Sequence, residues 1–111
     1  MLIQRQVRVE NEDGLHARPS ALITRKAITY SGDVYIKRIF PKEDSNKRYN
    51  CKEIMGVMSV DATQGSVVEL SITYEEHKNG MKQEAERLCS DLCDIISSPH
   101  DIIVERAIRE L

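Results

Sequence analysis

The strongest constraint on the fold of this chain is an abrupt change of pattern near its start. Residues 2–9, LIQRQVRV, alternate loosely between apolar and polar side chains, which is typical of a β-strand. Residues 11–14, NEDG, supply turn chemistry, and from residue 17 to about residue 28 the pattern becomes helical. Pro19 lies in the first turn of that helix, where its missing N–H removes no hydrogen bond. The helix therefore begins within a residue of His16, and its apolar positions include Ile23, Ala27 and Tyr30.

The middle of the chain predicts further strands. Residues 31–40, SGDVYIKRIF, begin with a turn and continue as a strand rich in β-branched and aromatic residues. Residues 41–48, PKEDSNKR, are polar and predict a long hairpin loop, followed by a short strand around residues 49–51. Residues 53–60, EIMGVMSV, fit either a strand or one to two turns of helix. Residues 63–74, TQGSVVELSITY, predict a turn and then a strand.

Two helices close the chain. The first is expected over residues 79–96, and SSPHD then breaks the pattern, with Ser97 or Ser98 expected to cap the last helix and Pro99 to start it. This order of elements predicts an α+β domain with a mostly antiparallel sheet. The apolar stripes of the two helices are Met81, Ala85, Leu88, Leu92 and Ile96 in the first, and Ile103, Val104, Ala107, Ile108 and Leu111 in the second.

Length and composition exclude several classes of protein. A chain of 111 residues is most simply one domain with a single core. Its net charge of −2 gives no basic field, so nucleic acid is not an expected partner. Residues 1–5 lack the apolar stretch of a signal peptide, and no run approaches the roughly 20 apolar residues needed to span a bilayer. We therefore expect a cytoplasmic protein without membrane insertion.

The three cysteines predict neither a metal site nor a disulfide framework. Cys89 and Cys93 are four residues apart on one helical face, and with Cys51 they are expected to pack in or beneath the core. Their odd number fits a reducing compartment. His77 and His100 have no ligand spacing relative to the cysteines, so no metal and no cofactor are expected.

His16 is the strongest candidate for a reactive group. An imidazole is a good nucleophile near neutral pH, and the free N–H groups of a helix start stabilise an incoming negative charge. Arg18 adds a fixed positive charge with several donors, while Gly14 allows the loop to turn tightly. The competing interpretation is that His16 is a polar helix cap and Arg18 a solvated surface charge. The combination of glycine, histidine, arginine and proline at one helix start favours phosphoryl capture on His16.

Two segments carry a resemblance to a known family. GLHARP, residues 14–19, resembles the active-site motif of the histidine-containing phosphocarrier (HPr) family of the phosphoenolpyruvate:sugar phosphotransferase system. Residues 52–72 are similar to the second typical stretch of Gram-positive-type members. The resemblance covers roughly residues 2–96, so we predict an HPr-like domain over 1–96 and a helical C-terminal extension over 97–111. It implies an open-faced β-sandwich, with four antiparallel strands and three helices on one face.

The resemblance also implies a function. His16 would accept a phosphoryl group on its pros ring nitrogen from enzyme I, and would donate it to enzyme IIA components for sugar uptake. Arg18 and the backbone N–H groups of Ala17 and Arg18 would hold the phosphoryl group. Such a protein is a monomeric carrier rather than an enzyme. The residues that match the family's docking patch beside the histidine are Ala21, Ile54, Met55 and Met58, for which core packing is the competing interpretation.

The chain departs from the family pattern in three places. Glu53 stands where many Gram-positive-type members have a serine that a kinase modifies, so that regulation is not expected here. The 40–50 hairpin is longer than usual, and the tail needs a surface, in this domain or in another chain, to cover its isoleucines. These departures keep open an alternative function, a regulatory docking module that binds a regulatory protein and signals through its histidine.

Overall fold

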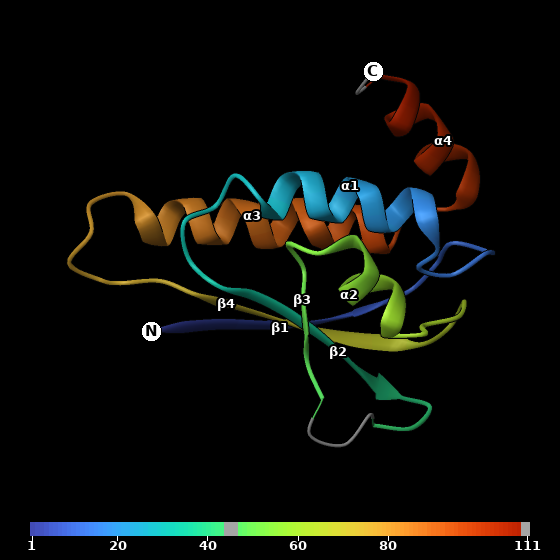
Figure 1. The fold of residues 1–111 in the computed structure, drawn as a ribbon, viewed down its shortest axis with the longest axis horizontal. Helices are drawn as coiled ribbons and strands as arrows, with labels where there is room; N and C mark the ends of the chain where they lie inside the picture. The colour runs from blue at the N-terminus through green and yellow to red at the C-terminus, as the bar shows by residue number, and fades with distance from the viewer. Residues whose placement is uncertain (44–46, 110–111) are drawn as a thin grey trace.

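The computed structural model describes residues 1–43 and 47–109 of the chain. The elements follow in the order β1 (Leu2–Arg8), α1 (Ala17–Ala27), β2 (Val34–Phe40), β3 (Tyr49–Asn50), α2 (Ile54–Ser59), β4 (Val67–Thr73), α3 (Met81–Ile96) and α4 (His100–Arg109). Figure 1 shows α1 and α3 lying side by side across one face of the sheet, with α4 standing at the end where the chain enters α1.

The strands form one antiparallel sheet in the order β1-β4-β2-β3. β1 pairs with β4 over its whole length, from Leu2 opposite Thr73 to Arg8 opposite Val67. β2 pairs with the other edge of β4, with a register irregularity between Arg38 and Phe40. This sheet with its helices confirms the predicted open-faced α+β architecture. The sequence pattern does not predict that the last strand lies between the first and the second.

The core lies between the sheet and the helices. Alternate residues of β4 and β2 point toward it, as expected for a sheet with one face covered. The predicted apolar positions of α1 and α3 are all buried. The largest fully buried side chains include Ile23, Ile36, Leu70, Ile72, Leu92 and Ile96.

The ambiguous segment at residues 53–60 is helical, since α2 covers Ile54–Ser59. Its buried residues Val57 and Val60 are three positions apart, which suits one face of a helix rather than one face of a strand. The predicted hairpin loop joins β2 to β3, and its residues 44–46 lie outside the described part of the chain. Its described residues are tied to β2, where the Lys37 ammonium lies 2.9 Å from the Glu43 carboxylate.

The last helix forms where predicted, but its predicted cap is wrong. Ser97 and Ser98 both turn back, and their hydroxyls donate to carbonyls of α3, at Cys93 and Asp94 respectively. These bonds satisfy carbonyl groups that the end of α3 leaves free. α4 instead begins at His100, one residue after Pro99, whose carbonyl accepts the first bond from the Ile103 N–H (3.1 Å).

Part of the tail is covered by this domain. Ile103 is fully buried in the common core, whereas Ile102 and Ile108 are exposed. Leu111, the last position of the predicted stripe, lies outside the described residues. The tail helix therefore buries one isoleucine against its own chain and leaves two at the surface.

The three cysteines lie in or beneath the core, as predicted. Cys51 and Cys89 are buried and Cys93 is partly buried, and all three are free thiols. In the described part of the chain, no helix is long and apolar enough to cross a membrane.

Candidate functional site

The loop between β1 and α1 is built to hold the residue before His16 in place. The Asn11 side-chain oxygen accepts from the Asp13 N–H (2.8 Å), and the Asn11 carbonyl accepts from the Gly14 N–H (3.0 Å). Gly14 adopts φ +74°, and the following Leu15 N–H donates to the Ala62 carbonyl (2.9 Å). The Leu15 side chain is also buried. Because Leu15 is held by both its backbone and its side chain, the position of the next residue, His16, is fixed.

His16 occupies the N-cap position of α1, but its ring makes no capping bond. Its backbone is extended (φ −88°, ψ −158°), and its carbonyl accepts from the Ser20 N–H at 3.0 Å. The ring is exposed and accepts no capping hydrogen bond from the N–H groups of α1. The structure thus does not favour the alternative in which the imidazole serves as a polar cap. An unused ring is available for chemistry.

Arg18 lies at the second residue of α1, beside His16. Its side chain is exposed, and no hydrogen bond or ion pair joins it to another residue in the described ranges 1–43 and 47–109. The first turn of α1 contains no acidic residue, so its N-terminal field is not opposed from within the helix. A free guanidinium and an uncompensated helix start favour a bound anion.

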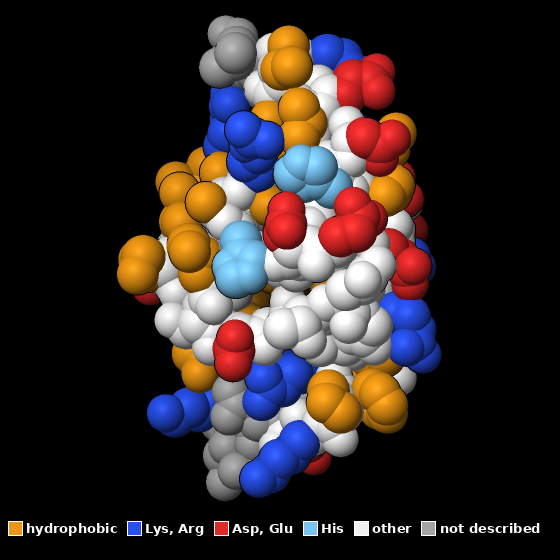
Figure 2. Space-filling view, turned by 90° about the vertical axis from the view of Figure 1, so that its right-hand side faces the viewer, with side chains coloured by type: hydrophobic (Ala, Val, Ile, Leu, Met, Phe, Trp, Pro, Cys, Tyr) orange, Lys and Arg blue, Asp and Glu red, His pale blue; other side chains and the backbone are white. Residues whose placement is uncertain are grey.

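These groups line one hollow of about 220 Å³, which is room for several water molecules. The hollow is bordered by Asn11, Asp13, His16, Ala17, Arg18, Pro19, His100 and Ile103. Figure 2 shows the face at this end of the molecule, with two histidine side chains, acidic side chains between them and a group of hydrophobic side chains to one side.

The predicted docking residues divide between surface and interior. Met55 and Ile54, in the first turn of α2, are 72% and 42% exposed, whereas Met58 and Ala21 are half-buried. α1, which carries Ala21, packs against α2. Glu53 is the N-cap residue of α2, with an exposed side chain that makes no capping bond.

The structure adds a contact that sequence reasoning missed. His100 Nδ1 lies 3.1 Å from Asp13 Oδ2, which joins the start of α4 to the loop before His16. Eighty-odd residues separate the two positions, and nothing in their local pattern signals the pairing. Among the described residues, no group of three or more histidine, cysteine or acidic side chains has the arrangement of a metal site.

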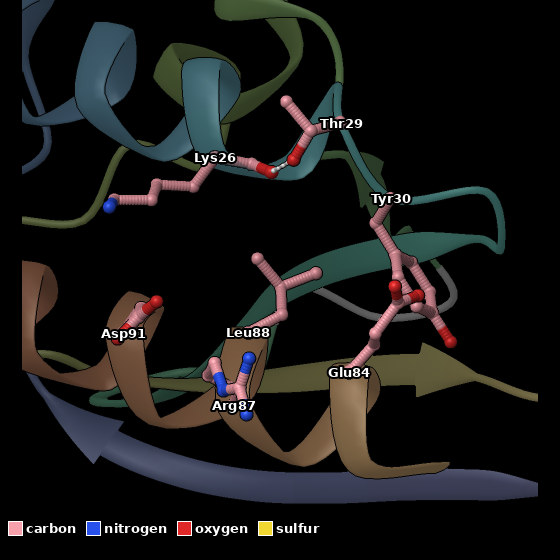
Figure 3. Close-up of a pocket in the computed structure, with 7 residues that line it drawn as sticks. All are labelled: Lys26, Thr29, Tyr30, Glu84, Arg87, Leu88 and Asp91. Carbon is pink, nitrogen blue, oxygen red and sulfur yellow. Dashed lines mark hydrogen bonds between the residues drawn. The ribbon is translucent and has the colours of Figure 1, made fainter. Parts of the chain in front are cut away.

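A second hollow of about 270 Å³ lies between the C-terminal half of α1 and α3. Figure 3 shows its lining, in which Lys26 and Asp91 lie at one end and Tyr30 and Glu84 at the other. The hollow carries charges of both signs and contains neither His16 nor Arg18. It is therefore not part of the site at the start of α1.

Comparison with known proteins decides the family. The family model described as the PTS HPr component phosphorylation site matches residues 3–90. The chain belongs to the HPr family. Its members include phosphocarrier proteins of the phosphotransferase system, and those phosphocarriers are carriers rather than catalysts.

Relatives of two kinds are similar to this HPr-family chain. The HPr-like protein Crh of Bacillus subtilis is 32% identical over 84 residues, covering 76% of this chain and 92% of Crh. The phosphocarrier protein HPr of Treponema pallidum is 38% identical over 71 residues, covering 64% of this chain and 74% of the relative.

A solved structure supports the same fold. The crystal structure of HPr from Bacillus anthracis superposes with a TM-score of 0.67 at 27% identity, covering 86% of this chain and 96% of that one. The crystal structure of B. subtilis Crh, described as a domain-swapped intertwined dimer, gives a TM-score of 0.54 at 30% identity, covering 85% and 97%.

Proposed function

We propose that this chain is a phosphoryl carrier and that His16 is its covalent site. The observation that supports this most is the unused, exposed His16 ring at the start of α1, beside the unpaired Arg18. In the transfer, the lone pair of the pros ring nitrogen forms a bond to phosphorus. The bond from phosphorus to the donor breaks, and its electron pair leaves with the donor. The proton on the other ring nitrogen is released to water or retained.

Arg18 and the start of α1 would stabilise the product. A phosphoryl group on His16 adds close to two negative charges. The Arg18 guanidinium offers donors without losing a partner, and the backbone N–H groups of Ala17 and Arg18 belong to the first turn, where helical acceptors are absent. These contacts make Arg18 a stabilising group and leave His16 as the one covalent residue.

The partners would be enzyme I as donor and enzyme IIA proteins as acceptors, met by a monomer of this chain. The exposed Met55 and Ile54 give α2 an adaptable apolar surface of the kind used for several partners in turn. Ala21 and Met58, being half-buried, would border that surface and contribute less contact area.

The test is phosphoryl uptake from phosphoenolpyruvate and a competent enzyme I, followed by intact mass. The wild type should gain one acid-labile phosphoryl group, and His16→Ala should gain none while remaining folded, because no capping bond is lost. Arg18→Ala should accept the group more slowly. His77→Ala is the matched control, since the His77 side chain is 79% exposed and does not line the hollow.

Two results would contradict this assignment. Labelling of His16→Ala on another histidine would place the covalent site elsewhere. Absence of labelling of the wild type with several enzyme I sources would remove the carrier function.

The second candidate is a regulatory docking module. It is favoured by the similarity to Crh, whose solved structure is described as a catabolite repression protein, and by Glu53 at the start of α2. In that role the chain would bind a regulatory protein through the α2 surface. Its binding would depend on Met55 and Glu53, and the state of His16 would only modulate it.

A further inference from the structure

The tail helix borders the hollow that contains His16. His100, the first residue of α4, and Ile103, one turn later, both line it. Residues three apart lie on the same helical face. Because Ile103 is fully buried, the turn that carries His100 is held against the domain.

His100 faces an acidic side chain at this hollow. Its Nδ1 lies 3.1 Å from Asp13 Oδ2, which is within ion-pair distance. Asp13 is the one acidic residue among the described residues that line the hollow. The remaining ionisable side chains there are His16 and Arg18.

An unpaired carboxylate at this place would oppose the proposed chemistry. A phosphoryl group brings nearly two negative charges, and a like charge nearby raises the free energy of the phosphorylated state. His100 Nδ1, at 3.1 Å from Asp13 Oδ2, offsets the negative charge of that carboxylate at the edge of the hollow. The positive charge of Arg18 then acts on the phosphoryl group with less opposition from Asp13.

The same loop holds an unpartnered donor. Asn11 is 1% exposed and lines the hollow, and its Nδ2 has no hydrogen-bond partner among the described residues. The Asn11 Oδ1 accepts from the Asp13 N–H, so the side-chain amide of Asn11 contacts both the Asp13 backbone and the hollow. A buried donor without a partner is costly, and an anion in the hollow would supply an acceptor.

We propose that His100 is a positioning residue for phosphorylation of His16: by lying against Asp13, it offsets the charge of the acidic side chain in the hollow that receives the phosphoryl group. This inference rests on the proposed function at His16. It gives α4, which lies outside the first 96 residues, a role at the His16 site.

The test uses phosphoramidate, a small donor that needs no protein partner. The bond from phosphorus to the amine nitrogen breaks, ammonia leaves with the electron pair, and the imidazole lone pair bonds to phosphorus. Occupancy is measured by peptide mapping at His16 and at the remote His77, and their ratio is the readout. Full-length wild type, His100→Gln, Asp13→Asn and the double variant are compared after circular dichroism shows each to be folded.

His100→Gln should lower the His16:His77 labelling ratio by about three- to tenfold, because the Asp13 carboxylate loses the group that offsets its charge a few ångströms from the phosphoryl group, in a partly solvated site. Asp13→Asn in the same chain should restore the ratio, and Asp13→Asn alone should label at least as well as wild type. If His100 only helped α4 to pack against the domain, Asp13→Asn would not restore the labelling ratio of His100→Gln.

An unchanged ratio in His100→Gln, or a double variant that stays low, would overturn the proposal. Uptake from enzyme I is measured separately on the wild type. A failure there, with the phosphoramidate pattern intact, would count against the carrier function and not against the role of His100.

Discussion

At the scale of single residues, Gly14 controls where His16 stands. Its φ is +74°, and a Cβ at this position would overlap the Ala62 carbonyl oxygen. Gly14→Ala should therefore lower the free energy of unfolding by about 2 kcal/mol or more, from the left-handed backbone and the clash together. Urea unfolding measures this. Gly65→Ala is the matched control, because Gly65 has φ +89° with open space around its Cβ position, and should cost only about 1 kcal/mol. Equal losses in the two variants would show that the approach to Ala62 is unimportant.

Sequence reasoning predicted the positions of His16 and Arg18 at the start of a helix and missed the contacts around them. His16 and Arg18 could be predicted because local chemistry places them, through a turn, a proline and a helix start. The contact of the loop with Ala62 and the pairing of His100 with Asp13 could not be predicted in this way. Both join positions far apart in the chain, and single-sequence patterns carry no information about such pairs.

At the scale of elements, α4 depends on one buried side chain. Ile103 is fully buried in the core while its neighbour Ile102 remains 37% exposed. Ile103→Ala should lower stability by about 2–4 kcal/mol through lost burial and a cavity, whereas Ile102→Ala should stay within about 1 kcal/mol. Hydrogen exchange should report faster opening of the α4 amides in Ile103→Ala only. Equal protection in both variants would mean that α4 is held by other contacts.

Element prediction succeeded where the periodic pattern was long. The limits of α1 and α3 were predicted to within about two residues, since each has three or more turns of apolar spacing. The short α2 remained ambiguous because six residues do not distinguish a strand from a helix. The cap of α4 was wrong because a serine after a helix has two uses, and here both hydroxyls close α3.

At the scale of the whole molecule, the order of strands is a tertiary choice. β4 lies between β1 and β2, so the last strand in the sequence is an interior strand of the sheet. Its burial pattern agrees with that place, because four of its seven residues are buried. The fold class could be predicted from element order. The path of the tail back to the start of α1 could not, because its isoleucines fitted either this domain or another chain.

The buried thiol of Cys51 couples the stability of the whole molecule to alkaline pH. Burial raises the pKa of the Cys51 thiol from 9.0 to about 12. Below pH 9 the thiol is protonated in both states and has no effect. Between pH 9 and 12 the unfolded chain ionises while the folded chain does not, so the free energy of unfolding falls as pH rises. By pH 11 this loss should be about 2–3 kcal/mol.

Cys51→Ala removes that ionisation, at the cost of a small cavity that does not depend on pH. The free energy of unfolding of both proteins is measured with urea under reducing conditions from pH 8 to 11. The difference between wild type and Cys51→Ala should shift steadily against the wild type above pH 9. Other groups that titrate there, such as Tyr30, are common to both proteins and cancel in the difference. Parallel pH profiles would mean that the Cys51 thiolate is accommodated in the folded state, and so that the core around β3 opens to water without global unfolding.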